Sequence, residues 1–204
     1  MRFFNFISNL ISNFITYLIQ NSVSEEYHAE IVRQIEKRFV KKGELLLKNG
    51  DICKYSFFVE KGLLRSYTID QNGKEHIIQF APEGWIVTDR SSSFFNESSE
   101  LYIDAIEDSE VFFLDKTLFE NISKVSTDFT KNNTQALHNH IRNLQNRINM
   151  LLGATAEERY LQFIKMYPDI LLRVPQWMIA SYLGITPESL SRVRKELTKK
   201  NFSQ

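Results

Sequence analysis

The amino-acid sequence predicts an α+β protein, with helices at both ends and an antiparallel β-sandwich or barrel between them. Three observations lead to this fold class. Short apolar runs separated by turn residues fill residues 39–114, which is typical of antiparallel strands. A heptad spacing of apolar residues follows at 137–151, as in a long helix that packs on one partner. A helix-turn-helix pattern begins at residue 176.

The N-terminal segment, residues 3–24, contains no charged residue. Polar residues recur along it at helical spacing, which predicts an amphipathic helix rather than a membrane span. They are Asn5, Ser8, Asn9, Ser12, Asn13 and Thr16. Docking of this helix on the rest of the protein is the favoured interpretation, and contact with a membrane surface is the alternative. We expect a second helix over residues 24–37, capped by Ser24.

The predicted strands are the apolar runs at 45–47, 55–59, 63–69, 76–80, 102–106 and 111–114. Glycine, asparagine and proline punctuate them about every ten residues, as in a sandwich or barrel. Asn72-Gly73 lies between two alternating runs and is the strongest hairpin signal in the chain.

The heptad seam consists of Leu137, Ile141, Leu144, Ile148 and Leu151. Its neighbours on the helix are polar, so the seam is narrow and fits one partner helix. A second copy of the chain is the favoured partner, which predicts a homodimer, while packing on the protein's own barrel is the alternative. Gly153 then ends or bends this helix, and Thr155 begins another that Pro168 closes.

The C-terminal segment has the features of two crossing helices. Ala180 is small where the helices approach each other, and Gly184 stands where the tight turn needs a positive φ. Thr186 is the expected N-cap of the second helix, and Pro187 is its first residue.

The distribution of charged residues indicates the class of molecule that this motif binds. Of the 204 residues 43% are hydrophobic and 25% charged, as in ordinary globular proteins. The net charge is zero, yet the segment from residue 173 to residue 200 contains six basic residues and only two acidic ones. This local excess favours binding of a polyanion. The single Cys53 excludes an intrachain disulfide, a cysteine-ligated iron–sulfur cluster and a structural zinc site, and it fits the reducing cytoplasm in which we place the protein.

A helical wheel divides the second helix into two faces. Leu190, Val193 and Leu197 form the core side, while Glu188, Ser191, Arg192 and Lys195 lie opposite. The exposed face of a recognition helix enters the major groove, where Arg pairs with guanine and Glu accepts from cytosine. We expect the residues that contact the DNA backbone to be Ser181, Thr186, Ser189, Arg194, Lys195, Lys199 and Lys200. A merely solvated face, or one for protein contacts, is the alternative.

The order of barrel, long helix and helix-turn-helix resembles the Crp/Fnr transcription regulators, relatives of the cyclic-AMP receptor protein. Residues 39–85 resemble the first part of their cyclic-nucleotide-binding barrel, and PESLSRVRKEL is similar to their recognition helix. The resemblance implies a double-stranded β-helix or jelly-roll barrel, a long dimerisation helix and a winged-helix-like C-terminal domain. It also implies that Glu188, Ser191 and Arg192 read bases, and that RNA polymerase is a further partner.

The cyclic-nucleotide pocket of the family is degenerate in this sequence. An ungapped alignment puts Thr88-Asp89 where the family has Gly-Glu, and Ser99-Glu100 where it has Arg-Ser. Loss of the phosphate-binding guanidinium is costly, although Arg90 stands nearby as a substitute. We therefore expect an unknown effector, or none, rather than cyclic AMP. We expect neither a cofactor nor a metal, because His76 is a lone histidine in a strand and His138 and His140 face different ways.

The expected domains are N-terminal helices at 1–38, the barrel at 39–115, a connecting and dimerisation helix at 116–153 and the helix-turn-helix domain at 154–204. The spacing from Pro168 to Gln176 predicts a shortened wing. The predicted function is a dimeric regulator that binds double-stranded DNA at a palindromic site. A ligand sensor or protein-interaction module without DNA binding is the second hypothesis. An enzyme ranks last, because no nucleophile, base and orienting group stand at a suggestive spacing.

Overall fold

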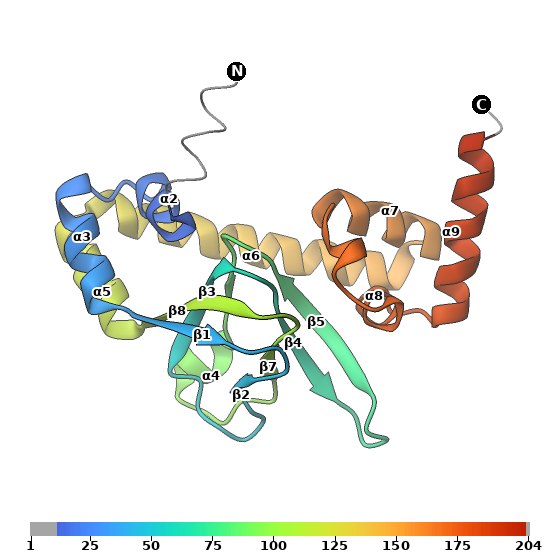
Figure 1. Cartoon of the computed structure of the whole chain (residues 1–204), viewed down its shortest axis with the longest axis horizontal. Helices are drawn as coiled ribbons and strands as arrows, with labels where there is room; N and C mark the ends of the chain where they lie inside the picture. The colour runs from blue at the N-terminus through green and yellow to red at the C-terminus, as the bar shows by residue number, and fades with distance from the viewer. Residues whose placement is uncertain (1–11, 203–204) are drawn as a thin grey trace. The chain divides into compact units, whose positions relative to one another are not determined.

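The computed structural model describes residues 12–202 and divides the chain into two compact units. The first unit comprises the described part of Met1–Thr68 together with Gln79–Leu137. The second comprises Ile69–Ile78 and the described part of His138–Gln204. The chain therefore passes between the units three times, twice along one β-hairpin and once along a helix (Figure 1).

The described strands form two four-stranded sheets, with the orders β1-β8-β3-β6 and β2-β7-β4-β5. The first sheet consists of β1 (Glu36–Val40), β8 (Ser109–Asp115), β3 (Tyr55–Lys61) and β6 (Ile86–Val87). The second consists of β2 (Leu45–Leu47), β7 (Tyr102–Ala105), β4 (Leu64–Ile69) and β5 (Glu75–Ala81). The β1–β8, β3–β8, β2–β7 and β4–β7 pairs are all antiparallel, which confirms the predicted sheet type.

Both faces of β3 and β8 are buried. Phe57 and Phe113 belong to the apolar core of the sandwich, together with residues of the second sheet such as Leu64 and Ile103. Their neighbours Phe58 and Phe112 point to the other face, because side chains alternate along a strand. That face needs a cover, and the helices of the first unit provide it.

The covering helices are α2 (Asn13–Gln20), α3 (Glu25–Gln34) and α5 (Lys116–Val125). Phe14 and Leu18 of α2 are completely buried in the same cluster as Phe58 and Phe112. The Glu60 carboxylate accepts hydrogen bonds from the backbone amides of Asn13 and Phe14, at 3.1 and 2.9 Å, and so fixes the start of α2. The described part of the N-terminal amphipathic helix thus docks on the sheet, as expected, while residues 3–11 of that prediction lie outside the described residues. No helix within residues 12–202 is long and apolar enough to span a bilayer.

Two sequence predictions need correction. The second helix does not reach residue 37, because α3 ends at Gln34 and residues Glu36–Val40 pair with β8 as strand β1. The segment expected to be one connecting helix is divided in two, since α5 ends at Val125 and α6 (Thr127–Gly153) follows Ser126, which has extended backbone. Helix α4 (Arg90–Phe95) was not anticipated at all.

Gly62 occupies a position that other residues cannot adopt without strain. Its φ is +97°, and a Cβ atom there would lie 2.8 Å from Ser109 Cα. We expect Gly62→Ala to lower the free energy of unfolding by roughly 2–4 kcal/mol, through backbone strain and overpacking. Urea denaturation measures this loss. The matched control is Gly84→Ala, at φ +78° with open space around it, for which a loss of only about 1 kcal/mol is expected. Equal losses in the two variants would contradict the packing argument.

The second unit contains the end of α6, then α7 (Ala156–Met166), a short 3-10 turn η1 (Ile170–Leu172), α8 (Gln176–Leu183) and α9 (Pro187–Phe202). The structure confirms the predicted end of α6 and the predicted start of α7. Helix α6 ends at Gly153, and Thr155 with Glu158 forms a capping box at the start of α7. The loop between β4 and β5, with Gly73 at φ +77°, confirms the predicted Asn72-Gly73 turn.

Candidate nucleic-acid interface

Helices α8 and α9 form a helix-turn-helix whose turn is set by Gly184. Its φ is +65°, and the amides of Gly184 and Ile185 donate to the carbonyls of Ser181 and Ala180. These bonds satisfy the free carbonyls at the end of α8, as in a glycine-terminated helix. Thr186 then caps α9, because its hydroxyl accepts from the Ser189 amide at 3.2 Å.

Arg159 of α7 fastens this turn, and sequence reasoning missed it. Its guanidinium donates to three backbone carbonyls, those of Leu151, Ala154 and Leu183, at 3.0–3.1 Å. One side chain thereby joins the end of α6, the start of α7 and the end of α8. An arginine on a helix gives no sequence signal for such a role, because all three partners are backbone atoms.

The two faces of α9 differ in exposure as the helical wheel predicts. Leu190 and Val193 are buried, at 1% and 8% exposure. Glu188, Ser191, Arg192 and Lys195 are all exposed. The face that sequence analysis assigns to the major groove is therefore open to solvent in the second unit, while the opposite face supports the fold.

The start of α9 orders the side chains of this exposed face. The Ser189 hydroxyl lies 3.3 Å from the Thr186 hydroxyl and 3.3 Å from Arg192 Nη2. Hydrogen bonds from its own backbone amide and from Thr186, with Arg192 nearby, hold the pKa of Glu188 below its ordinary value. Glu188 is therefore an anion at neutral pH and acts only as a hydrogen-bond acceptor.

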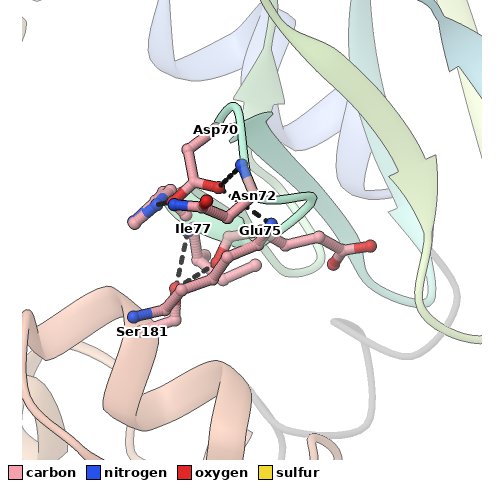
Figure 2. A network of polar contacts seen from close by, with 7 residues as sticks. Asp70, Asn72, Glu75, Ile77 and Ser181 are labelled. Carbon is pink, nitrogen blue, oxygen red and sulfur yellow. Dashed lines mark hydrogen bonds and ion pairs between the residues drawn. The ribbon is translucent and has the colours of Figure 1, made fainter.

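The residues expected to contact phosphates lie in different settings. Arg194, Lys195 and Lys199 are exposed on α9. Lys200 forms an ion pair with Glu157 of α7, with Nζ 2.7 and 2.9 Å from the two carboxylate oxygens. Thr186 and Ser189 belong to the N-cap of α9. Ser181 bonds to the β4–β5 hairpin, as Figure 2 shows.

The predicted heptad seam forms an exposed apolar stripe on α6. Leu137, Ile141, Leu144, Ile148 and Leu151 retain 38–56% of their accessible surface. Most polar residues between them are exposed as well. Five large apolar side chains in one line on a polar helix are typical of a helix that packs against a partner.

The positions aligned with the family's nucleotide pocket bond to one another. Asp89 caps α4 by accepting from the Ser92 amide, and its second carboxylate oxygen accepts from the Ser99 hydroxyl at 2.7 Å. The Ser92 hydroxyl accepts from the Cys53 amide and donates to the Glu97 carbonyl. The polar groups at these positions are thus used within the chain.

The other three residues aligned with or next to the pocket, Thr88, Arg90 and Glu100, also interact within the chain. Thr88 donates to the Tyr55 carbonyl at 3.2 Å. Arg90 interacts electrostatically with Tyr17 of α2, and burial raises the pKa of Tyr17 to about 12. Glu100 is exposed, and its carbonyl accepts from the Asn49 side chain. No guanidinium hydrogen-bonds to Asp89 or Ser99 among the bonds that the structure gives these residues.

Within residues 12–202, no three histidine, cysteine or carboxylate side chains lie close enough together to hold a metal ion. His76 bonds to Asp70, with Nε2 2.8 Å from the carboxylate oxygen. In the described segment between α7 and α8, the 3-10 turn Ile170–Leu172 stands where the family's winged hairpin was expected in a shortened form.

The chain resembles known regulators in sequence. Residues 37–125 match the model of the cyclic nucleotide-binding domain. Electron transport regulator A of Shewanella oneidensis is 27% identical over 77% of this chain and 66% of its own length. The anaerobic regulatory protein of Pasteurella multocida is 26% identical over 80% of this chain and 63% of its own length. The chain thus spans slightly less than two thirds of these two relatives.

Solved structures resemble the chain in fold. FixK2 from Bradyrhizobium japonicum has a TM-score of 0.71 at 21% identity, covering 82% of this chain and 86% of that one. A variant of CooA from Carboxydothermus hydrogenoformans has a TM-score of 0.68 at 23% identity, covering 87% and 82%. The match to the cyclic nucleotide-binding domain, the similar regulators and the shared fold all support the resemblance of this chain to the Crp/Fnr regulators.

Proposed function

We propose that the protein is a transcription regulator that binds double-stranded DNA as a homodimer at a palindromic site, in the bacterial cytoplasm and with RNA polymerase as a further partner. The observation that carries this proposal is the exposed face of α9. Glu188, Ser191 and Arg192 are open to solvent, while Leu190 and Val193 on the opposite face are buried. Such a face at the start of the second helix is what enters the major groove in helix-turn-helix proteins.

Base reading is assigned to the three residues of that face. The Arg192 guanidinium presents two donors to the O6 and N7 atoms of guanine, and the ionised Glu188 accepts from the amino group of cytosine. Ser191 donates or accepts at a neighbouring base edge. The contact between Arg192 and Ser189 orients the guanidinium before DNA arrives, which reduces the entropy lost on binding.

Backbone contacts are assigned to Arg194, Lys195 and Lys199, which supply charge without reading sequence. Thr186 and Ser189 supply neutral contacts close to the N-terminus of α9, where backbone amides favour an anion. Lys200 is also assigned a phosphate contact. Its ammonium group forms an ion pair with Glu157 in the free protein, so the phosphate has to compete with this carboxylate.

Dimerisation is assigned to the seam on α6. Two copies of this stripe facing each other across a two-fold axis would bury Ile141, Leu144, Ile148 and Leu151 against their own copies. The two recognition helices would then read half-sites about 34 Å apart, one turn of the duplex. A palindromic site follows from this symmetry.

The barrel is not assigned a cyclic nucleotide. The Asp89 carboxylate and the Ser99 hydroxyl bond to each other, and an anionic phosphate beside a carboxylate without a guanidinium is unfavourable. The proposed regulator responds to another effector or binds DNA constitutively.

Duplex binding at several salt concentrations tests the proposal. We count Arg194, Lys195 and Lys199 on each protomer and leave out Lys200, whose charge is already paired with Glu157. We then expect log K to fall with log salt at a slope of roughly −5. Negligible binding to mixed-sequence duplex at low salt would contradict the proposal. It would favour a ligand sensor or a protein-interaction module, with α9 exposed for a protein partner.

A further inference from the structure

The first helix of the helix-turn-helix is hydrogen-bonded to the β4–β5 hairpin through Ser181. Its hydroxyl accepts from the Ile77 amide at 3.0 Å and donates to the Glu75 carbonyl at 2.9 Å (Figure 2). A hydroxyl has one proton to donate, so the bond to Glu75 uses the donor capacity of Ser181. In this arrangement Ser181 cannot also donate to a DNA phosphate.

Arg147 of α6 bonds to the same strand. Its Nη2 atom donates to the Ile77 carbonyl at 3.0 Å and to the Tyr182 carbonyl at 3.2 Å. The guanidinium also lies over the Tyr182 ring, 3.8 Å from its centroid, an attractive cation–π geometry. The amide and the carbonyl of Ile77 are thus both bonded to the helices of the second unit.

The hairpin itself is internally braced. One carboxylate oxygen of Asp70 accepts from the amides of Asn72 and Lys74, at 2.8 and 3.0 Å. The other lies 2.8 Å from His76 Nε2. A braced hairpin transmits a displacement along its strands, whereas a loose loop would absorb it.

We propose that Ser181 and Arg147 form a clamp that fixes α8, and through the Gly184 turn α9, to the hairpin. This inference rests on the proposed function, because it makes Ser181 and Arg147 positioning residues for DNA reading. Ser181 acts on the hairpin and not on a phosphate. The clamped segment Ile69–Ile78 belongs to the second unit, while β4 and β5 continue into the first. A change in the sandwich that moves these strands therefore reaches α8 directly, in addition to any movement of α6.

The first test uses DNA affinity of the full-length protein. We expect Ser181→Ala to weaken binding to its selected palindrome about 5- to 20-fold, with an unchanged salt slope, because no phosphate charge is involved. Ser181→Thr keeps the hydroxyl and should restore most of the affinity. The matched control is Ser123→Ala, which removes a hydroxyl bonded to the Phe119 carbonyl in the first unit and should leave affinity unchanged. Wild-type affinity in Ser181→Ala would overturn the clamp.

A second test combines Ser181→Ala with Arg147→Met. If the two side chains act as one clamp, the double variant should lose little more affinity than the worse single variant, since contacts that share a partner are not additive. Full multiplication of the two fold-losses would show that each residue acts alone, for example Ser181 on DNA, and would overturn the proposal.

Hydrogen exchange of the Ile77 amide, followed by NMR in the absence of DNA, separates the clamp from the proposed function. We expect this amide to exchange at least 10-fold faster in Ser181→Ala than in the wild type. Unchanged exchange would overturn the clamp, whatever the protein does with DNA. Faster exchange in a protein that binds no duplex would support the clamp and contradict the proposed function instead.

Discussion

A variant in which Leu144 and Ile148 are both changed to Glu is expected to be monomeric and to bind a palindromic duplex about 100- to 10,000-fold more weakly. Both side chains lie on the exposed seam of α6, at 43% and 56% exposure. In a two-fold symmetric pair each seam residue meets its own copy or a near neighbour. Four carboxylates would then be desolvated at one interface, which like charges strongly oppose. In a monomer the second helix-turn-helix is no longer tethered to the first, so it loses the high effective concentration that favours its binding to the second half-site.

Sedimentation velocity and binding anisotropy measure the two parts of this result. The matched control is Gln145→Glu with Asn146→Glu, which adds the same charge at exposed positions beside the seam. It should remain dimeric and bind DNA nearly as well as the wild type. A seam variant that keeps the wild-type mass but unfolds at lower temperature would contradict the account, because the seam would then pack within one chain.

Arg192→Ala is expected to cost about 1–3 kcal/mol, or roughly 5- to 150-fold in affinity, on the preferred site. The loss should concentrate at one base pair of each half-site, where the preference for guanine would fade. The physical reason is the loss of two parallel donors that only guanine accepts in the major groove. Affinity for duplexes with each base at every position measures this effect. The fold should be unaffected, since the Arg192 side chain is exposed.

Lys199→Ala is the comparison variant for this prediction. Lys199 lies near the end of the same helix, on a part of the surface assigned to phosphates. Its loss should weaken all duplexes alike and reduce the salt slope by about 1 per protomer. If Arg192→Ala and Lys199→Ala reduced specific and random binding by the same factor, the reading face would be assigned incorrectly.

Local signals in the sequence predicted the elements that depend on neighbouring residues. The Asn72-Gly73 turn, the positive φ of Gly184 and the start of α7 at Thr155 each need only a few adjacent positions. The two faces of α9 also follow from helical periodicity alone. The Gly184 turn and the two faces of α9 belong to the helix-turn-helix, so the structure of the candidate interface was among the most predictable parts of the protein.

Contacts between distant segments were not predictable in the same way. Strand β1 forms because Glu36–Val40 pairs with β8, which begins more than 70 residues later in the chain. The local sequence of this segment is equally compatible with the end of a helix. The buried ion pair of Arg65 and Asp104, with nitrogen–oxygen distances of 2.7 and 2.8 Å, joins two strands 39 residues apart. The clamp of Ser181 on Ile77 spans 104 residues. A single sequence contains no signal that pairs such positions.

The residues aligned with the family's nucleotide pocket illustrate why long-range contacts, which a single sequence does not reveal, matter for the proposed function. Alignment on the family motif located Thr88, Asp89, Ser99 and Glu100 in the sequence. The bond between Asp89 and Ser99, and the role of Ser92 between Cys53 and Glu97, required the structure. The hydrogen-bond network adds a second reason, beside the missing arginine, for the proposal that cyclic AMP is not the effector.

Selection from random duplex DNA, with the wild type and with Arg192→Ala, tests the central claim most directly. The account predicts a palindromic consensus with half-sites one helical turn apart, and loss of one guanine preference in each half-site for the variant. No enrichment by the wild type, or a consensus that Arg192→Ala leaves unchanged, would contradict the assignment of α9 as the helix that reads DNA.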